Sequence, residues 1–152
     1  MDVVANPSDL SEVFFTNYIP TNSQGVYKLK YYASRKDFDL KKIYKTGKDN
    51  YHGRPLGLAF DENNILFGTV AYLDTENNAG NSGISAYDRA SDSFFYKSLK
   101  IGTAVRKPLV TDGYVWVPLP RDNNLAAVNY KGTVNTSDDE IFFVKKTDGL
   151  PT

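Results

Sequence analysis

The sequence predicts an all-β fold, and three observations lead to this class. Its apolar residues fall in short runs rich in Val, Ile, Phe and Tyr, separated by Asn, Asp, Gly and Pro, without the 3.6-residue period of a helix. A pattern of four such runs recurs along the chain. The chain has 152 residues, of which 41% are hydrophobic and 14% aromatic, so we expect one globular unit with a buried core.

Each run is interpreted as a strand, because β-branched and aromatic side chains pack well on a pleated surface and the intervening residues favour turns. The polar stretch Ser34–Leu40 admits a brief helical turn capped by Ser34, but a polar loop is the favoured interpretation. The candidate strands are Val13–Tyr18, Val26–Tyr32, Leu40–Tyr44, Leu56–Phe60, Ile65–Val70, Gly83–Tyr87, Phe94–Leu99, Leu109–Thr111, Tyr114–Pro118, Leu125–Tyr130 and Ile141–Lys145.

The strands form an internal repeat. One copy begins with Gly53–Asp61, and the pattern restarts at Arg106–Gly113, so that the equivalent Pro55 and Pro108 are 53 residues apart. Working backward, Asp2–Pro7 opens a further copy. The three copies occupy residues 2–52, 53–105 and 106–152 approximately, and together they tile the chain as one segment, 1–152.

Four strands in a repeat of this size correspond to one blade of a β-propeller, in which each small sheet buries its faces against neighbouring blades. Three blades alone would expose an apolar face at each end. The sequence therefore predicts half of a six-bladed ring that a second half-propeller completes, either another copy or a different chain. An all-β sandwich with accidental self-similarity is the alternative.

The repeat also predicts which side chains form the core. These are the apolar residues of the innermost and central strands, which we expect to be largely buried between blades: Leu56, Leu58, Phe60, Leu66, Phe67, Leu109, Val115, Trp116, Val117, Phe142 and Val144.

Composition argues against several classes of function. Eighteen Lys and Arg balance eighteen Asp and Glu, so no overall attraction to nucleic acid or to an anionic membrane is expected. No apolar run is long enough to span a membrane, and Met1–Pro7 lacks the pattern of a signal peptide. The chain has no cysteine and one histidine, His52, so disulfides, thiolate metal sites and cysteine catalysis are excluded.

Three segments resemble successive blades of the yellow and major royal jelly protein family, which forms six-bladed propellers. Val3–Pro7 followed by Val13–Phe15 is similar to that family's blade opening, Leu58–Gly68 to its next blade, and Asp112–Val117 to its last blade. The resemblance implies a secreted, extracellular ligand-binding protein. Gly53–Phe60 is equally similar to propellers of the gluconolactonase and strictosidine-synthase type.

The chain departs from that family in ways that limit what the resemblance implies. Members are longer and carry cysteines. The amine-binding branch has a Thr and an Asn lining the channel, whereas the nearest positions here are Lys107 and Pro120, so amine binding is not expected. No catalytic motif of the enzymatic branch can be placed on these residues.

The candidate ligand-binding residues are cations that flank two innermost strands, where propellers bind ligands at one mouth of the channel. They could meet an anionic or carbonyl-bearing small ligand, and the alternative is a solvated loop. His52 could act as a general base, but no Ser, Cys or carboxylate partner is evident for it. The candidates are His52, Arg54, Arg106 and Lys107.

The residues leave two classes of function open. The favoured one is a non-catalytic binding or scaffold propeller without a cofactor. The other is a calcium-dependent hydrolase or isomerase of the gluconolactonase or strictosidine-synthase type, for which carboxylates would have to project into the channel. The carboxylates lie mostly at predicted turns, which Asx residues favour for backbone reasons alone. They are Asp61, Glu62, Asp88, Asp112, Asp138, Asp139 and Glu140.

Overall fold

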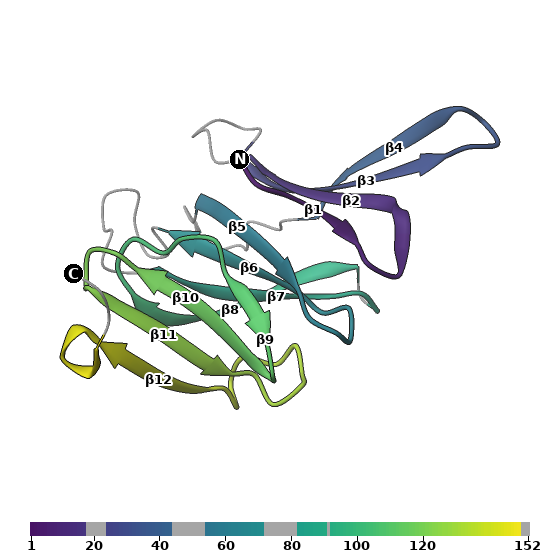
Figure 1. Cartoon of the computed structure of the whole chain (residues 1–152). Coiled ribbons are helices and arrows are strands. Elements are labelled where there is room, and N and C mark those ends of the chain that lie inside the picture. Colours follow the sequence, from purple (N-terminus) through teal and green to yellow (C-terminus); the bar gives the residue numbers. More distant parts are fainter. Residues whose placement is uncertain (18–23, 44–53, 72–81, 91, 150–152) are drawn as a thin grey trace.

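The computed structural model describes residues 1–17, 24–43, 54–71, 82–90 and 92–149, with residues 93–99 and 146 described by their backbone alone. These residues form three antiparallel four-stranded sheets, which confirms the all-β prediction (Figure 1). Sheet 1 contains β1 (Val3–Asn6), β2 (Asp9–Asn17), β3 (Gly25–Tyr32) and β4 (Asp37–Lys42). Sheet 2 contains β5 (Arg54–Phe60), β6 (Leu66–Ala71), β7 (Ser82–Asp88) and β8 (Ser93–Gly102). Sheet 3 contains β9 (Leu109–Thr111), β10 (Tyr114–Leu119), β11 (Asn124–Asn129) and β12 (Glu140–Lys145).

Helix is nearly absent from the described residues, where the assigned helix is a single 3₁₀ turn at Lys146–Asp148. Residues 33–36 form a turn before β4, so the loop interpretation of Ser34–Leu40 is correct for residues 34–36 and wrong for residues 37–40, which belong to β4. In the part of the chain that the structure describes, no helix has the length and apolar character needed to cross a membrane.

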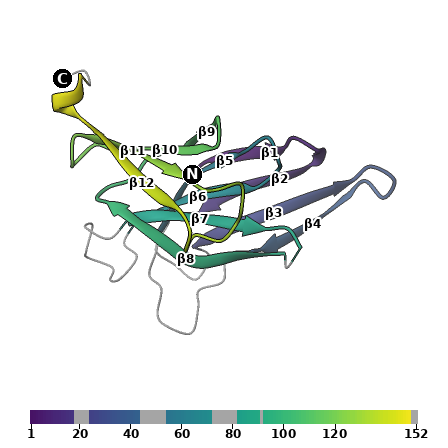
Figure 2. The same cartoon turned by 90° about the horizontal axis from the view of Figure 1, so that it is seen from below.

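Within each sheet the strands are ordered as in the chain, so β1, β5 and β9 are the first strands of their sheets. Figure 2 shows these three strands next to one another, with β4 and β8 at the opposite edge. The sheets follow one another across the molecule, with sheet 2 between sheets 1 and 3 (Figure 1). This arrangement gathers the N-terminal ends of the three first strands at one place.

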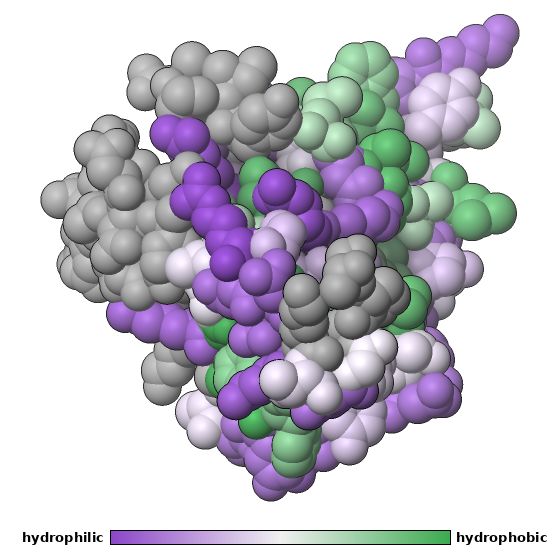
Figure 3. Space-filling model, turned by 60° about the vertical axis from the view of Figure 1, so that its left-hand side comes forward, coloured by the Kyte–Doolittle hydropathy of each residue, from purple (hydrophilic) through white to green (hydrophobic). Residues whose placement is uncertain are grey.

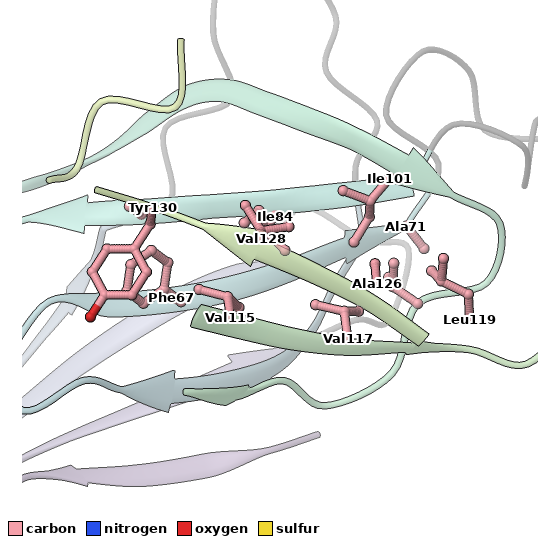
Figure 4. Packing of buried hydrophobic residues seen from close by; sticks show 12 residues of the cluster. Phe67, Ala71, Ile84, Ile101, Val115, Val117, Leu119, Ala126, Val128 and Tyr130 are labelled. Carbon is pink, nitrogen blue, oxygen red and sulfur yellow. The ribbon is translucent and has the colours of Figure 1, made fainter. Parts of the chain in front are cut away.

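The core between sheets 2 and 3 follows from strand alternation. In β10, Val115, Val117 and Leu119 are at most 1% exposed and face sheet 2, whereas the alternate residues lie on the other side. Phe67 and Ile84 of sheet 2 meet them from the opposite side (Figure 4). Each such side chain contributes roughly 1.5 to 3 kcal/mol when it is fully buried, so this interface fixes the two sheets against each other.

A second core lies between sheets 1 and 2. Phe14 of β2 is 1% exposed, and its ring centroid lies 5.6 Å from that of Tyr87 and 5.5 Å from that of Phe60. Leu58 and Leu66 of sheet 2 belong to the same cluster and are fully buried. The two faces of sheet 2 are therefore both covered, one by each neighbour.

Polar contacts also join the sheets. Asp92, in the turn between β7 and β8, accepts hydrogen bonds from Tyr87 and from Lys41 of sheet 1. Burial opposes ionisation of the Asp92 carboxyl, but its partners hold its pKa below the usual value. Thr103, just after β8, donates from its backbone N–H (2.7 Å) and hydroxyl (2.5 Å) to Asp122, which follows β10.

The predicted core is correct for the residues that face a neighbouring sheet and wrong for two others. Leu109 is 62% exposed and Phe142 is 50% exposed. Both lie on the side of sheet 3 that no other sheet covers, whereas the prediction assumed a neighbour on every face. Four more predicted core residues are only partly buried: Leu56, Phe60, Trp116 and Val144.

Candidate functional site

One end of the first strands carries the predicted cations. Lys107, just before β9, places its Nζ 2.9 Å from Oδ1 of Asp2, which precedes β1. The other oxygen of Asp2 accepts the backbone N–H of Leu58 in β5, also at 2.9 Å. A single carboxylate therefore connects the residues that precede β1 and β9 with the middle of β5. We call this end of the first strands the cationic mouth, and define it by Arg54, Arg106 and Lys107.

Backbone and hydroxyl contacts hold Asp2 in this position. Its N–H donates to Oγ1 of Thr16 at 2.8 Å, and the Thr16 hydroxyl donates to the carbonyl of Leu56 at 3.2 Å. Burial of the Asp2 carboxyl opposes its ionisation, yet the Leu58 N–H and Lys107 hold its pKa below the usual value. Asp2 is thus an ionised anchor at neutral pH.

The other predicted cations differ in their surroundings. Arg106 is exposed, and its Nη1 donates to the carbonyl of Val105 at 3.3 Å. Arg54 is half-buried at the start of β5, where it pairs in register with Ala71. His52 lies outside the described residues. In β5 it is Gly57 that lies against the backbone of Lys107, whereas Arg54 begins that strand three residues earlier.

The opposite ends of β5 and β9 carry acidic residues. Asp61, Glu62 and Asp112 follow these strands and line a cleft of about 200 Å³ together with Tyr130. Asp61 is 6% exposed, and its oxygens accept hydrogen bonds from the N–H of Ile65 (2.6 Å) and the hydroxyl of Tyr130 (2.9 Å). Burial and this hydrogen bond raise the pKa of Tyr130 to about 12.

These contacts give Asp61 the turn role that the sequence predicts for such residues. Its Oδ1 closes the β5–β6 turn, and its Oδ2 joins sheet 2 to sheet 3. Across the described residues, no group of three or more His, Cys, Asp or Glu side chains is arranged to hold a metal ion. We call the residues Asp61, Glu62 and Asp112 the acidic mouth.

Sequence reasoning missed Asp2 and Asp92, the two residues whose carboxylates connect neighbouring sheets. Asp2 and Lys107 are 105 positions apart, and nothing in either segment indicates that they pair. Asp92 has a φ of 49° in a turn, where Asp is common for backbone reasons. The proximity of the first strands, which the repeat predicts, was the one available signal for the Asp2 contact.

The fold has a counterpart among solved structures. No protein-family model matches the chain, and no curated protein matches it in sequence. Among solved structures it is similar to a luciferin-regenerating enzyme, a β-propeller, with a TM-score of 0.54 and 14% sequence identity. The chain folds as β-propeller blades.

Sheets 1 to 3 are these blades. The similarity covers 95% of this chain but 44% of the luciferin-regenerating enzyme, so the chain spans less than half the length of that protein. At this level of identity the likeness is one of fold. The resemblance to the yellow and royal jelly family rests on the sequence motifs given above.

One carboxyl near the acidic end is in an unfavourable environment. Both oxygens of Asp139, in the loop before β12, are buried without a hydrogen-bond partner among the described residues. Burial, together with the neighbouring charge of Asp138, raises the pKa of Asp139 to about 6. Because this value lies above that of the unfolded chain, Asp139 favours folding at low pH and opposes it as the pH rises through 6.

We expect Asp139→Asn to stabilise the protein at pH 7 and to leave its stability unchanged near pH 4, where Asp139 is already protonated. The full pKa shift corresponds to about 3 kcal/mol, and solvent screening of this half-buried group reduces the expected gain to about 1 to 2 kcal/mol. Chemical denaturation at the two pH values measures the gain. Asp138→Asn, at the exposed neighbouring position, removes only the smaller cause of the shift and should stabilise the protein less than Asp139→Asn does. Equal stability of Asp139→Asn and the unmodified protein at pH 7 would contradict the prediction.

Proposed function

We propose that the chain is a non-catalytic binding propeller of the yellow and royal jelly type, which holds a small anionic ligand at the cationic mouth. The order of the blade motifs supports the family, and the blade fold is compatible with it. The position of the cations at the beginnings of the first strands supports the site, because propellers commonly bind ligands at a channel mouth.

The observation that carries this proposal is the arrangement of Arg106 and Lys107. Arg106 is exposed beside the first strands, and no ion pair within the described residues includes it. Lys107 is held in place by Asp2, so its ammonium group is positioned and not merely solvated. A charge-assisted hydrogen bond to a partly desolvated anion contributes about 1.5 to 3 kcal/mol, and two such cations suffice for recognition of a carboxylate or phosphate.

The binding site would be complete only in a full ring. Three blades provide half of a six-bladed propeller, and the channel is closed by a second half-propeller, which is either another copy or a different chain. The remaining wall of the site would come from that half. If the family resemblance holds, the protein acts outside the cell.

Arg106→Ala with Lys107→Ala is expected to weaken anion binding at least tenfold, because the loss of even one charge-assisted hydrogen bond costs about 1.5 kcal/mol. Isothermal titration calorimetry with citrate and inorganic phosphate measures the effect. Thermal unfolding is expected to change little, since an exposed ion pair such as Lys107–Asp2 contributes at most about 1 kcal/mol.

Lys131→Ala is the matched control. Lys131 forms an ion pair with Glu140 at the same distance, 2.9 Å, but follows β11 and so lies away from the cationic mouth. Affinity should be unchanged in this variant. Equal affinities of all variants would assign Arg106 and Lys107 to a solvated loop, and a large loss of stability would assign them a structural role.

The alternative is a calcium-dependent hydrolase or isomerase at the acidic mouth. The cleft beside Glu62 and Asp112 favours it, since calcium prefers carboxylate oxygens. Against it, both oxygens of Asp61 already accept hydrogen bonds from the protein. Stoichiometric calcium binding, together with lactone hydrolysis that is lost on chelation, would favour the enzyme over the binding protein.

A further inference from the structure

The repeat shows what covers the equivalent face of each blade. Phe14 in sheet 1 and Phe67 in sheet 2 occupy the same position in the second strands of their sheets, and each is 1% exposed because the next sheet covers it. Trp116 occupies that position in β10 of sheet 3, on a side that no further sheet of the described residues covers. The side of sheet 3 that carries Trp116 is therefore equivalent to the sides of sheets 1 and 2 that form interfaces with a following sheet.

One row of this face is apolar across all four strands of sheet 3. Leu109, Trp116, Ala127 and Phe142 are paired in register from β9 to β12 and so form one row on the same side of the sheet. Tyr114 packs beside them, with its ring centroid 5.8 Å from that of Trp116 and 6.5 Å from that of Phe142. We call this surface the sheet 3 face.

Sheet 1 has the complementary open surface. Its side away from sheet 2 carries three groups of residues paired in register, and the rings of Phe15 and Tyr27 stack with centroids 5.3 Å apart. Apolar side chains reach the surface over the strands of sheet 1, at the upper right of Figure 3. The sheet 1 face is defined by Val3, Phe15, Tyr27, Ala5, Val13, Leu29, Leu40, Tyr31 and Phe38.

We propose that a second copy of this chain closes the ring, with the sheet 3 face of each copy packed against the sheet 1 face of the other. The inference rests on the proposed half-propeller but not on the proposed ligand. Within the chain, sheets 1 and 2 and sheets 2 and 3 already pack by joining these two kinds of face. A second copy would place its sheet 1 face against the sheet 3 face of the first copy, and its sheet 3 face against the sheet 1 face of the first copy. These two identical contacts, related by a two-fold axis, would close a ring of six blades.

The repeat also predicts which residues meet. The ring centroids of Phe67 and Tyr130 lie 4.7 Å apart across the interface of sheets 2 and 3. Trp116 is equivalent to Phe67, and Tyr31 of the second copy is equivalent to Tyr130 by its register. Trp116 should therefore pack against Tyr31 of the second copy. Tyr31 is 46% exposed in the single chain, so this contact would bury both rings.

The charges in the two faces are compatible with this contact. The rows of the sheet 1 face include one charged residue, Lys42, and those of the sheet 3 face include Glu140. The signs are opposite, and the other residues of these rows are uncharged, although Thr111 and Asn129 in the row of Glu140 are polar. Two copies would therefore meet without like charges opposed, and a large exposed apolar surface of this kind is unusual for a monomer.

The test uses Trp116, which is the sole tryptophan of the chain. Light scattering over a range of concentrations should show a dimer of twice 17.0 kDa. Over the same range, Trp116 emission should shift to shorter wavelength and its quenching by acrylamide should fall as the dimer forms. A monomer at all concentrations, open chains of many copies, or a dimer in which Trp116 stays accessible would overturn the proposal.

Variants separate the contact from folding. Trp116→Asp should weaken dimerisation at least tenfold, because burying an unpaired carboxylate costs several kcal/mol. Phe143→Asp is the control, since Phe143 is 42% exposed and pairs with Ala126, on the opposite side of sheet 3. A dimeric Trp116→Asp variant would contradict the contact. Citrate binding is measured on the same samples, so a dimer without anion binding would reject the proposed function alone.

Discussion

Phe67→Ala is expected to cost about 3 to 5 kcal/mol of the free energy of unfolding, which is among the largest effects of any single substitution in this chain. Phe67 is 1% exposed and lies in the core between sheets 2 and 3, where its ring packs on that of Tyr130. Removal of the ring leaves a cavity that the backbones of two sheets cannot easily close. Chemical denaturation at one fixed protein concentration measures the cost.

Phe143→Ala is the comparison for Phe67→Ala, because it removes the same side-chain atoms at a different position. Phe143 is 42% exposed in β12, so its removal creates no enclosed cavity and should cost less than about 1 kcal/mol. A Phe67→Ala variant that is as stable as the Phe143→Ala variant would mean that sheets 2 and 3 are not packed as described. Loss of the Tyr130–Asp61 contact does not account for the expected difference, because both groups remain in the variant.

The sequence was sufficient for the strands and for the order of the sheets. Alternation in β10 separates Val115 and Val117 from Trp116, and short turns connect strands that are neighbours in the chain. The prediction was wrong for Leu109 and Phe142 because alternation indicates the face on which a residue lies, whereas it does not indicate whether a neighbour covers that face. These two exposed residues are consistent with a missing blade and not with a wrong register.

Sequence reasoning could propose candidate cations next to the first strands, but it could not predict their contacts. The equivalence of the first strands places Arg54 and Lys107 at one end of their sheets. The pairing of Lys107 with Asp2 depends on how sheets 1 and 3 approach β5, and that approach is set by packing of whole sheets. Polar contacts between distant segments leave no periodic pattern in a sequence, which is why the links at Asp92 were also missed.

The predicted cations and the turn carboxylates lie at opposite ends of the first strands, although the carboxylate of Asp2 lies among the cations and pairs with Lys107. The first strands begin beside Arg106 and Lys107, and β5 and β9 end beside Asp61 and Asp112. An anion would be attracted to Arg106 and repelled by Asp61 and Asp112. The overall charge of zero conceals this separation, so composition alone could not indicate it.

Gly57→Ala is expected to destabilise the protein by about 2 to 3 kcal/mol and to weaken anion binding. A Cβ at position 57 would lie 2.4 Å from Cα of Lys107 and 2.9 Å from Cδ of Pro108. These atoms belong to the backbone and to a proline ring, so relief requires the segment before β9 to move away from β5, at the cost typical of overpacking. That movement would also draw Lys107 away from Asp2, and the loss of anion affinity should therefore accompany the loss of stability.

Gly25→Ala is the matched control, because its Cβ would meet Cε of Lys42 at a similar 2.5 Å. The end of a lysine side chain can rotate aside, so this variant should lose less than about 1 kcal/mol, and the reduced entropy of its unfolded chain offsets part of that. Thermal unfolding and citrate titration of both variants distinguish the two cases. If Gly57→Ala behaved as Gly25→Ala does, the close approach of β5 to Lys107 would be wrong, and with it the shared mouth on which the ligand proposal depends.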